Sequence, residues 1–91
     1  MNKAVFLDRD GVINKELGRY CETVDEFEIL EDVGLAIKVL KEAGFLVIII
    51  SNQGGIAKGL YTEADVNQMH DKLCQHTSKF GANIDDFYFC P

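Results

Sequence analysis

Two carboxylates separated by a single residue follow the first apolar run of the chain. Asp8 and Asp10 come directly after residues 4–7, and Gly11 follows them. An apolar run of this length is typical of a buried parallel strand, and residues i and i+2 of an extended segment point the same way. Because unpaired buried charge is costly, acids at the end of such a strand indicate a ligand site. Two carboxylates so placed can hold one Mg²⁺ ion, and they can divide the roles of nucleophile and proton donor.

A polar cluster also follows the apolar residues 45–50. Ser51 is its first residue, and the backbone amides of residues 52–55 come next. A hydroxyl and several amides at the end of a strand provide donors for phosphoryl oxygens. Taken alone, the acid pair suits a solvated or helix-capping pair, and the serine suits a polar turn. Both signals at the ends of successive strands are much harder to explain by chance.

The elements that must position these residues follow an alternating pattern. Residues 4–7, 45–50 and 85–90 are expected to form strands, and residues 32–43 and the segment from Thr62 to Gly81 are expected to form helices. T-E-A-D at residues 62–65 resembles a capping box. Such alternation predicts a parallel sheet with right-handed crossovers. We therefore expect one α/β domain over residues 1–91, with a Rossmann-like three-layer fold that stops after its third strand. Residues 45–50 should form a central strand buried on both faces.

Residues 11–30 are mostly polar and contain Gly18 and five acids. A loop of this length in a compact domain is often functional. We expect a flap beside the site, pinned to the body by Tyr20, Val24, Phe27 and Ile29.

Composition narrows the classes of partner. The 91 residues carry a net charge of −6, which disfavours nucleic acid and anionic membranes. No apolar run is long enough to span a bilayer, and we expect no signal peptide. Three cysteines without a close pair favour a reducing cytoplasm over a disulfide framework. The expected partner is a small phosphorylated metabolite in the cytoplasm.

FLDRDGVIN (residues 6–14) followed by IIISNQGGIAKG (48–59) resembles the haloacid dehalogenase-like (HAD) phosphatase superfamily. More narrowly, these segments and the closing DDFYFCP (85–91) are similar to the D-glycero-D-manno-heptose 1,7-bisphosphate phosphatase and histidinol-phosphatase group. The resemblance implies a Mg²⁺-dependent phosphomonoesterase without a large cap domain.

The resemblance also implies a role for each matching position. Asp8 would be the nucleophile and a Mg²⁺ ligand. Asp10 would protonate the leaving group, then act as base on the hydrolytic water, and contribute its backbone carbonyl to Mg²⁺. Four residues would contact phosphate or substrate: Ser51, Asn52, Gln53 and Lys58.

The sequence departs from the family pattern after its third expected strand. In the superfamily, a later lysine and a later acid of the catalytic centre would follow that strand. Cys90 and Pro91 are the expected start of a zinc loop, and the rest of that loop would also follow the strand. One thiolate cannot make a structural zinc site. We therefore expect zinc at Cys90 only in a longer chain, and a catalytic centre that is incomplete.

The resemblance implies heptose 1,7-bisphosphate as the preferred substrate, hydrolysed through an aspartyl-phosphate, with histidinol phosphate as the alternative. A different class of function is a non-catalytic fragment that binds phosphate or metal, or that self-associates through its uncovered sheet edge. A receiver-type phosphoacceptor is a weaker alternative, because its acid would end the third strand, where this chain has Phe89 and Cys90.

Overall fold

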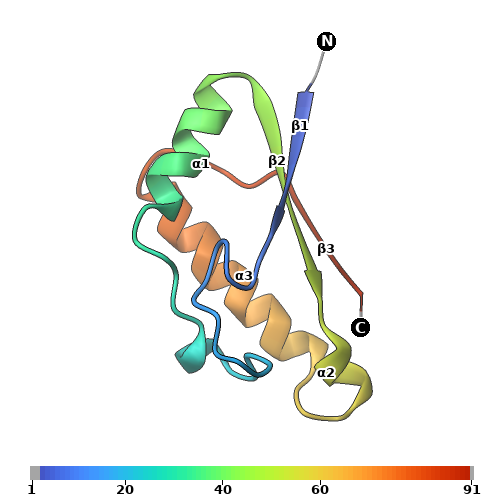
Figure 1. Ribbon diagram of the computed structural model, residues 1–91. Helices are drawn as coiled ribbons and strands as arrows, with labels where there is room; N and C mark the ends of the chain where they lie inside the picture. Colours follow the sequence, from blue (N-terminus) through green and yellow to red (C-terminus); the bar gives the residue numbers. More distant parts are fainter. Residues whose placement is uncertain (1–2, 91) are drawn as a thin grey trace.

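The computed structural model describes residues 3–90 and shows a small α/β arrangement (Figure 1). Strands alternate with helices, as the sequence predicts. In chain order the elements are β1 (Lys3–Asp8), the 3₁₀ helix η1 (Val24–Glu26), α1 (Val33–Glu42), β2 (Phe45–Asn52), α2 (Gly54–Ala57), α3 (Glu63–Ser78) and β3 (Asp86–Cys90).

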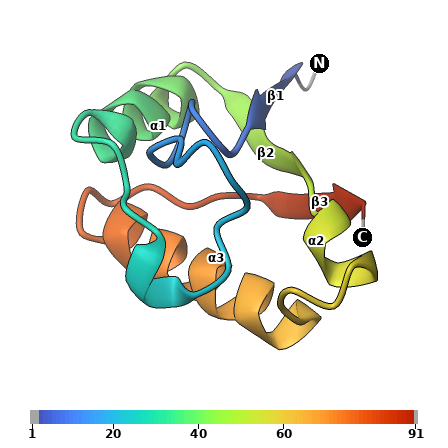
Figure 2. The same cartoon turned by 60° about the horizontal axis from the view of Figure 1, so that its bottom comes forward.

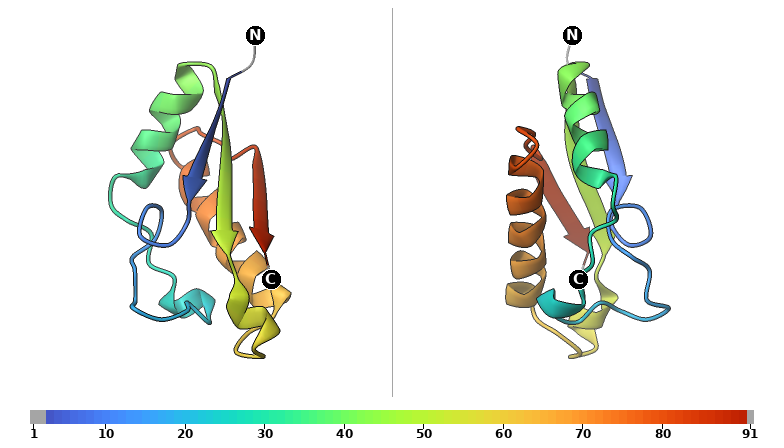
Figure 3. Two further views of the ribbon diagram at one scale, coloured as in Figure 1. Left: turned by 45° about the vertical axis from the view of Figure 1, so that its right-hand side comes forward. Right: turned by 90° about the vertical axis from the view of Figure 1, so that its left-hand side faces the viewer.

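The three strands form one parallel sheet in the order β1-β2-β3, so β2 is central (Figure 3). Asp8 at the end of β1 pairs with Ile50, and Ser51 of β2 pairs with Phe89. This register brings the carboxyl ends of β1 and β2 to the same edge of the sheet. The predicted α/β class, the parallel sheet and the central position of residues 45–50 are confirmed.

Both long helices lie on one side of the sheet and pack against each other (Figure 2). Val47 and Ile49 of β2 are buried in one core with Ile37 of α1 and with Met69 and Leu73 of α3. Right-handed crossovers between strands that are added in sequence order place both connecting helices on the same face. The core is therefore a single layer between the sheet and the helices.

The opposite face of the sheet has no helix within residues 3–90. Phe6, Leu46 and Tyr88 point to this side and are 59%, 37% and 57% exposed. The expectation that residues 45–50 are buried on both faces is wrong, and the described chain has two of the three expected layers. An apolar run identifies a strand, but not whether a second layer is present to cover it.

Local signals set the ends of the elements. Thr62 and Asp65 form the predicted capping box at the start of α3, and Gly44 takes a positive φ of 90° after α1. Strand β3 starts one residue later than predicted, because the Asp85 carboxylate accepts from Val47 N and Lys41 Nζ, each at 2.6 Å. The hydrogen bond from Lys41 is the main reason that the pKa of Asp85 is lowered.

The flap predicted over residues 11–30 is anchored at its base and its middle. Lys15 N donates to Glu28 O at 2.8 Å and Leu30 N to Ile13 O at 2.9 Å, which ties its two ends together. Phe27 in its second half is fully buried. The short helices η1 and α2 were not expected, since three or four residues are too few to show a helical period. Among the helices of residues 3–90, none has the length and apolar character that crossing a membrane requires.

Candidate active site

The two predicted catalytic acids lie where β1 ends. Asp8 is its last residue and is exposed, and the next residue stays on the sheet edge because Arg9 N donates to Ile50 O at 3.1 Å. The Asp10 carboxylate accepts from Arg9 Nη2 at 3.1 and 3.3 Å and from Asn14 Nδ2 at 2.9 Å. About a third of the Asp10 side chain is exposed, at 34%. Asp10 is therefore fixed in orientation while it remains accessible.

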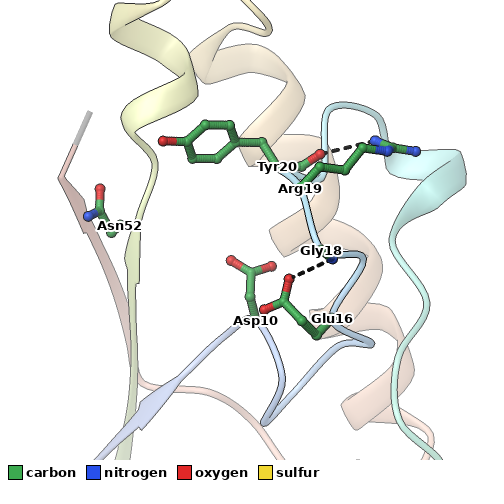
Figure 4. Close-up of a pocket in the computed structure, with 6 residues that line it drawn as sticks. All are labelled: Asp10, Glu16, Gly18, Arg19, Tyr20 and Asn52. Atoms are coloured by element: carbon green, nitrogen blue, oxygen red, sulfur yellow. Dashed lines mark hydrogen bonds between the residues drawn. The ribbon is translucent and has the colours of Figure 1, made fainter.

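A cavity of about 500 Å³ opens beside Asp10 (Figure 4). Its wall combines the end of the sheet with the first part of the flap, and its lining residues are Asp10, Glu16, Gly18, Arg19, Tyr20 and Asn52. Residues 16–20 of the flap thus form one side of the pocket.

The tip of the flap is held by its own polar groups. Glu16 Oε1 accepts from Gly18 N at 3.1 Å, and Arg19 forms an ion pair with Glu26 while Arg19 Nη1 donates to Tyr20 O at 3.1 Å. The hydrogen bond from Arg19 lowers the pKa of Glu26. These contacts hold the Arg19 side chain in the flap, with its guanidinium turned away from Asp10 (Figure 4).

Tyr20 connects the flap to the segment after β2. A Cβ atom at Gly54 would lie 3.0 Å from the Tyr20 hydroxyl, and Lys58 Nζ lies 5.2 Å from the centroid of the Tyr20 ring. The absence of a side chain at Gly54 lets the two segments approach. Lys58 therefore lies close to Tyr20, which lines the pocket, although Lys58 is not itself among the lining residues.

The remaining predicted site residues differ in accessibility. Asn52 lines the pocket, and Ser51 beside it is half-buried. Gln53 is buried at 1% exposure, and its side chain contacts protein groups. Its expected contact with substrate stays a prediction, while its observed contacts are with Arg9, Ser51 and Tyr61.

Two buried polar residues support Asp10 in a way that the sequence did not predict, although Arg9 was considered from the sequence as a source of local positive charge for a phosphate. Arg9 and Asn14 are each 1% exposed and bind the Asp10 carboxylate from below. A signal for Arg9 was present, because alternation along β1 places position 9 on the same side as Leu7, toward the core. Asn14 carries no comparable signal, since it reaches Asp10 only through the turn after β1.

The donor set at the sheet edge fits Mg²⁺ better than zinc. Asp8 and Asp10 would supply oxygen ligands, and Mg²⁺ combines one or two carboxylates with retained waters. Within residues 3–90, no group of three or more His, Cys, Asp and Glu side chains could surround a metal. Structural zinc sites are built from four sulfur and nitrogen ligands of Cys and His. The predicted ligand Cys90 has a side chain outside the described part, so zinc binding in a longer chain stays a prediction.

Known proteins resemble this chain over nearly its whole length. A heptose-1,7-bisphosphate 7-phosphatase of Chlorobaculum tepidum is 40% identical over 89 residues, which are 98% of this chain and 45% of that protein. The corresponding enzyme of Escherichia coli strain K12 is 38% identical over 88 residues, or 97% of this chain and 46% of the relative. The chain therefore spans about half the length of these relatives.

A solved structure is similar to this chain in its fold as well as in its sequence. The D,D-heptose 1,7-bisphosphate phosphatase from B. bronchiseptica, complexed with magnesium and phosphate, superposes with a TM-score of 0.93 at 35% identity. The match covers 98% of this chain and 50% of that one. A family model described as polynucleotide kinase 3 phosphatase matches residues 3–90. Both the residues and the fold agree with the predicted resemblance, and the chain belongs to this family of HAD-like phosphatases.

Proposed function

We propose that this chain provides the nucleophile and phosphate-binding part of a cytoplasmic Mg²⁺-dependent phosphatase that hydrolyses a heptose 1,7-bisphosphate. The observation that carries the proposal is the Asp10 carboxylate, fixed by Arg9 and Asn14 and still open to a cavity that Asn52 and the flap also line. A pocket whose lining residues are mainly charged or polar suits a sugar phosphate. The similar proteins reported above are named for heptose bisphosphate and none for histidinol phosphate, which favours the sugar.

The reaction would proceed in two displacements. An Asp8 carboxylate oxygen attacks phosphorus, the bond from phosphorus to the sugar oxygen breaks, and Asp10 protonates the departing oxygen. A water molecule then attacks the aspartyl-phosphate, and Asp10 takes its proton as inorganic phosphate and free Asp8 form. Ser51 and Asn52 would donate hydrogen bonds to the phosphoryl oxygens. Asp8 and the Asp10 carbonyl would hold Mg²⁺, which supplies positive charge against those oxygens when bound.

A second candidate is a centre that binds phosphate and metal without turnover. It is favoured by the metal-ligand set, because residues 3–90 hold no group of three or more His, Cys, Asp and Glu side chains that could surround a metal ion.

The experiment is phosphate release by the purified chain with Mg²⁺, given heptose 1,7-bisphosphate or histidinol phosphate in parallel. Asp8→Asn is the matched control, since it removes the nucleophile with almost no change in shape. Release from the heptose substrate that falls to background in Asp8→Asn supports the enzyme. Binding of phosphate without release supports the second candidate, and release that Asp8→Asn retains contradicts the assignment of Asp8.

A further inference from the structure

A positively charged side chain is buried directly beneath the proposed site. Arg9 separates the two acids in sequence and is 1% exposed. Its guanidinium lies 5.3 Å from the centroid of the Phe27 ring, and Nη1 lies 3.5 Å from Met69 Sδ. Arg9 therefore fills the space between the flap, α3 and the carboxyl edge of the sheet.

The guanidinium contacts the segments that follow both β1 and β2. On one side, Nη2 donates to the Asp10 carboxylate at 3.1 Å. On the other side, the Gln53 amide oxygen accepts from Nη1 at 3.1 Å and from Nη2 at 2.9 Å. The Gln53 oxygen faces Arg9 because the opposite orientation would turn the amide NH₂ toward guanidinium donors. One planar group thus joins Asp10 to Gln53.

Gln53 extends this connection to the phosphate-binding segment. Its oxygen also accepts from Ser51 Oγ at 3.0 Å, and its NH₂ donates to the Tyr61 hydroxyl at 2.5 Å. Tyr61 is itself 5% exposed. The link therefore runs from Asp10 through Arg9 and Gln53 to Ser51, and it is anchored in the core at Tyr61.

Burial of the charged Arg9 side chain is energetically unfavourable, so space filling alone does not explain why an arginine is present. Removal of an ion from water carries a large desolvation cost, which one partly exposed carboxylate offsets only in part. Arg9 Nε also has no hydrogen-bond partner within residues 3–90. Lysine carries the same charge, but its single ammonium cannot present the two-pronged fork that reaches Asp10 and Gln53 together. The geometry uses the shape of the guanidinium as well as its charge.

We propose that Arg9 is a positioning residue that sets the distance and orientation between Asp10 and the Ser51 segment through Gln53. This inference rests on the proposed function, because it assigns the purpose of the link to phosphate binding between those two segments. It also gives buried Gln53 a role in positioning.

The test is the affinity of the purified chain for inorganic phosphate in the presence of Mg²⁺, measured by calorimetry. Arg9→Lys and Gln53→Leu are each expected to weaken phosphate binding about tenfold, as loss of a supporting partner does in metal sites. The double variant should bind no more weakly than the weaker single variant, because each change breaks the same link. Thermal unfolding verifies that each variant is folded at the temperature of the titration.

Met69→Leu is the matched control, since it removes only the sulfur contact to Arg9 and should keep wild-type affinity. Wild-type phosphate binding by Arg9→Lys would overturn the proposal, because charge alone would then suffice. Fully additive losses in the double variant would overturn it too. If Arg9→Lys does not fold, unchanged binding by folded Gln53→Leu overturns it and weakened binding supports it. Absence of phosphate binding in the wild-type chain itself would instead overturn the proposed function, and the role of Arg9 with it.

Discussion

At the scale of single residues, several polar side chains are buried together with the hydrophobic core, and His70 is one of them. His70 on α3 is 7% exposed and stacks on Phe87 of β3, with ring centroids 4.1 Å apart and an interplanar angle of 15°. Its Nε2 has no hydrogen-bond partner within residues 3–90. Burial first, and then the positive charge of Arg9, lower the pKa of His70 to about 4. His70 therefore acts as a neutral aromatic part of the core.

We expect the free energy of unfolding to decrease as the pH falls from 6.5 to about 4. Unfolded His70 takes up a proton near pH 6.5, whereas the folded residue stays neutral, so each pH unit between the two pKa values costs about 1.4 kcal/mol. Urea unfolding of the wild-type chain and of His70→Gln at pH 7 and pH 5 measures this contribution. The carboxyl groups titrate in both proteins, so equal pH dependence in the two would contradict the prediction.

Gly55 presents a second test at this scale. A Cβ atom there would lie 2.2 Å from Tyr61 Cε1, in a buried site, so we expect Gly55→Ala to lower the free energy of unfolding by about 1–3 kcal/mol. Gly54→Ala is the matched control, because its nearest contact is the hydroxyl of Tyr20 at 3.0 Å, at the far end of a flexible side chain. Chemical unfolding of both variants measures the difference. Equal losses would show that the close approach of Gly55 to Tyr61 is unimportant.

At the scale of elements, the flap depends on α3 as well as on its own hydrogen bonds. Lys72 Nζ donates to the backbone oxygens of Phe27 at 2.7 Å and Val24 at 3.4 Å. These bonds satisfy carbonyl groups of the irregular segment around η1 from outside it. The flap is therefore held at its base by the Ile13 and Leu30 pairing and in its middle by α3.

Removal of the Lys72 ammonium should loosen the flap while the helix stays intact. A hydrogen bond from a charged donor contributes roughly 1.5 kcal/mol, so Lys72→Met should speed amide hydrogen exchange in residues 15–28 about tenfold. Exchange in α1 should stay unchanged.

Lys79→Met is the control for Lys72→Met, because Lys79 is exposed at the end of α3. Faster exchange confined to α3, or an equal effect of both changes, would argue against a tie between Lys72 and the flap. Exchange followed by mass spectrometry resolves the two segments.

At the scale of the whole molecule, the sheet has one covered face and one open face. The open face carries Phe6 and Tyr88, each more than half exposed, with Leu46 between their strands. Contiguous exposed apolar surface favours association. The earlier expectation of self-association through a sheet edge stays a prediction, and the structure adds this face as a second surface for it.

We expect the wild-type chain to self-associate with rising concentration and Phe6→Thr to shift it toward monomer. Threonine keeps the preference for strand while it removes the exposed ring. Sedimentation equilibrium over a range of concentrations gives the association constant. Val39→Thr is the control, since Val39 is 59% exposed on α1, away from the sheet. A wild-type chain that stays monomeric, or equal effects of both changes, would contradict the prediction.

The site was partly predictable because its signals are local. The acids at the end of β1 and the serine near the end of β2 follow apolar runs, and parallel pairing necessarily brings such strand ends together. The capping box of α3 and the glycine after α1 are equally local and were identified. The role of Asn14 and the buried contacts of Gln53 were not predicted. Both depend on how the turns and the flap fold back onto the rest of the chain.

The sequence by itself determined the order and type of the long elements, the parallel sheet and the family. The reason is that the hydrophobic period, the helix caps and the motifs each depend on residues that are close together in the sequence. Only the tertiary structure decided three further features: the open second face of the sheet, the pocket wall formed by the flap, and the buried link through Arg9. The physical reason is that burial and hydrogen bonding between distant segments depend on which surfaces meet. An apolar strand or an arginine between two acids is compatible with several such arrangements.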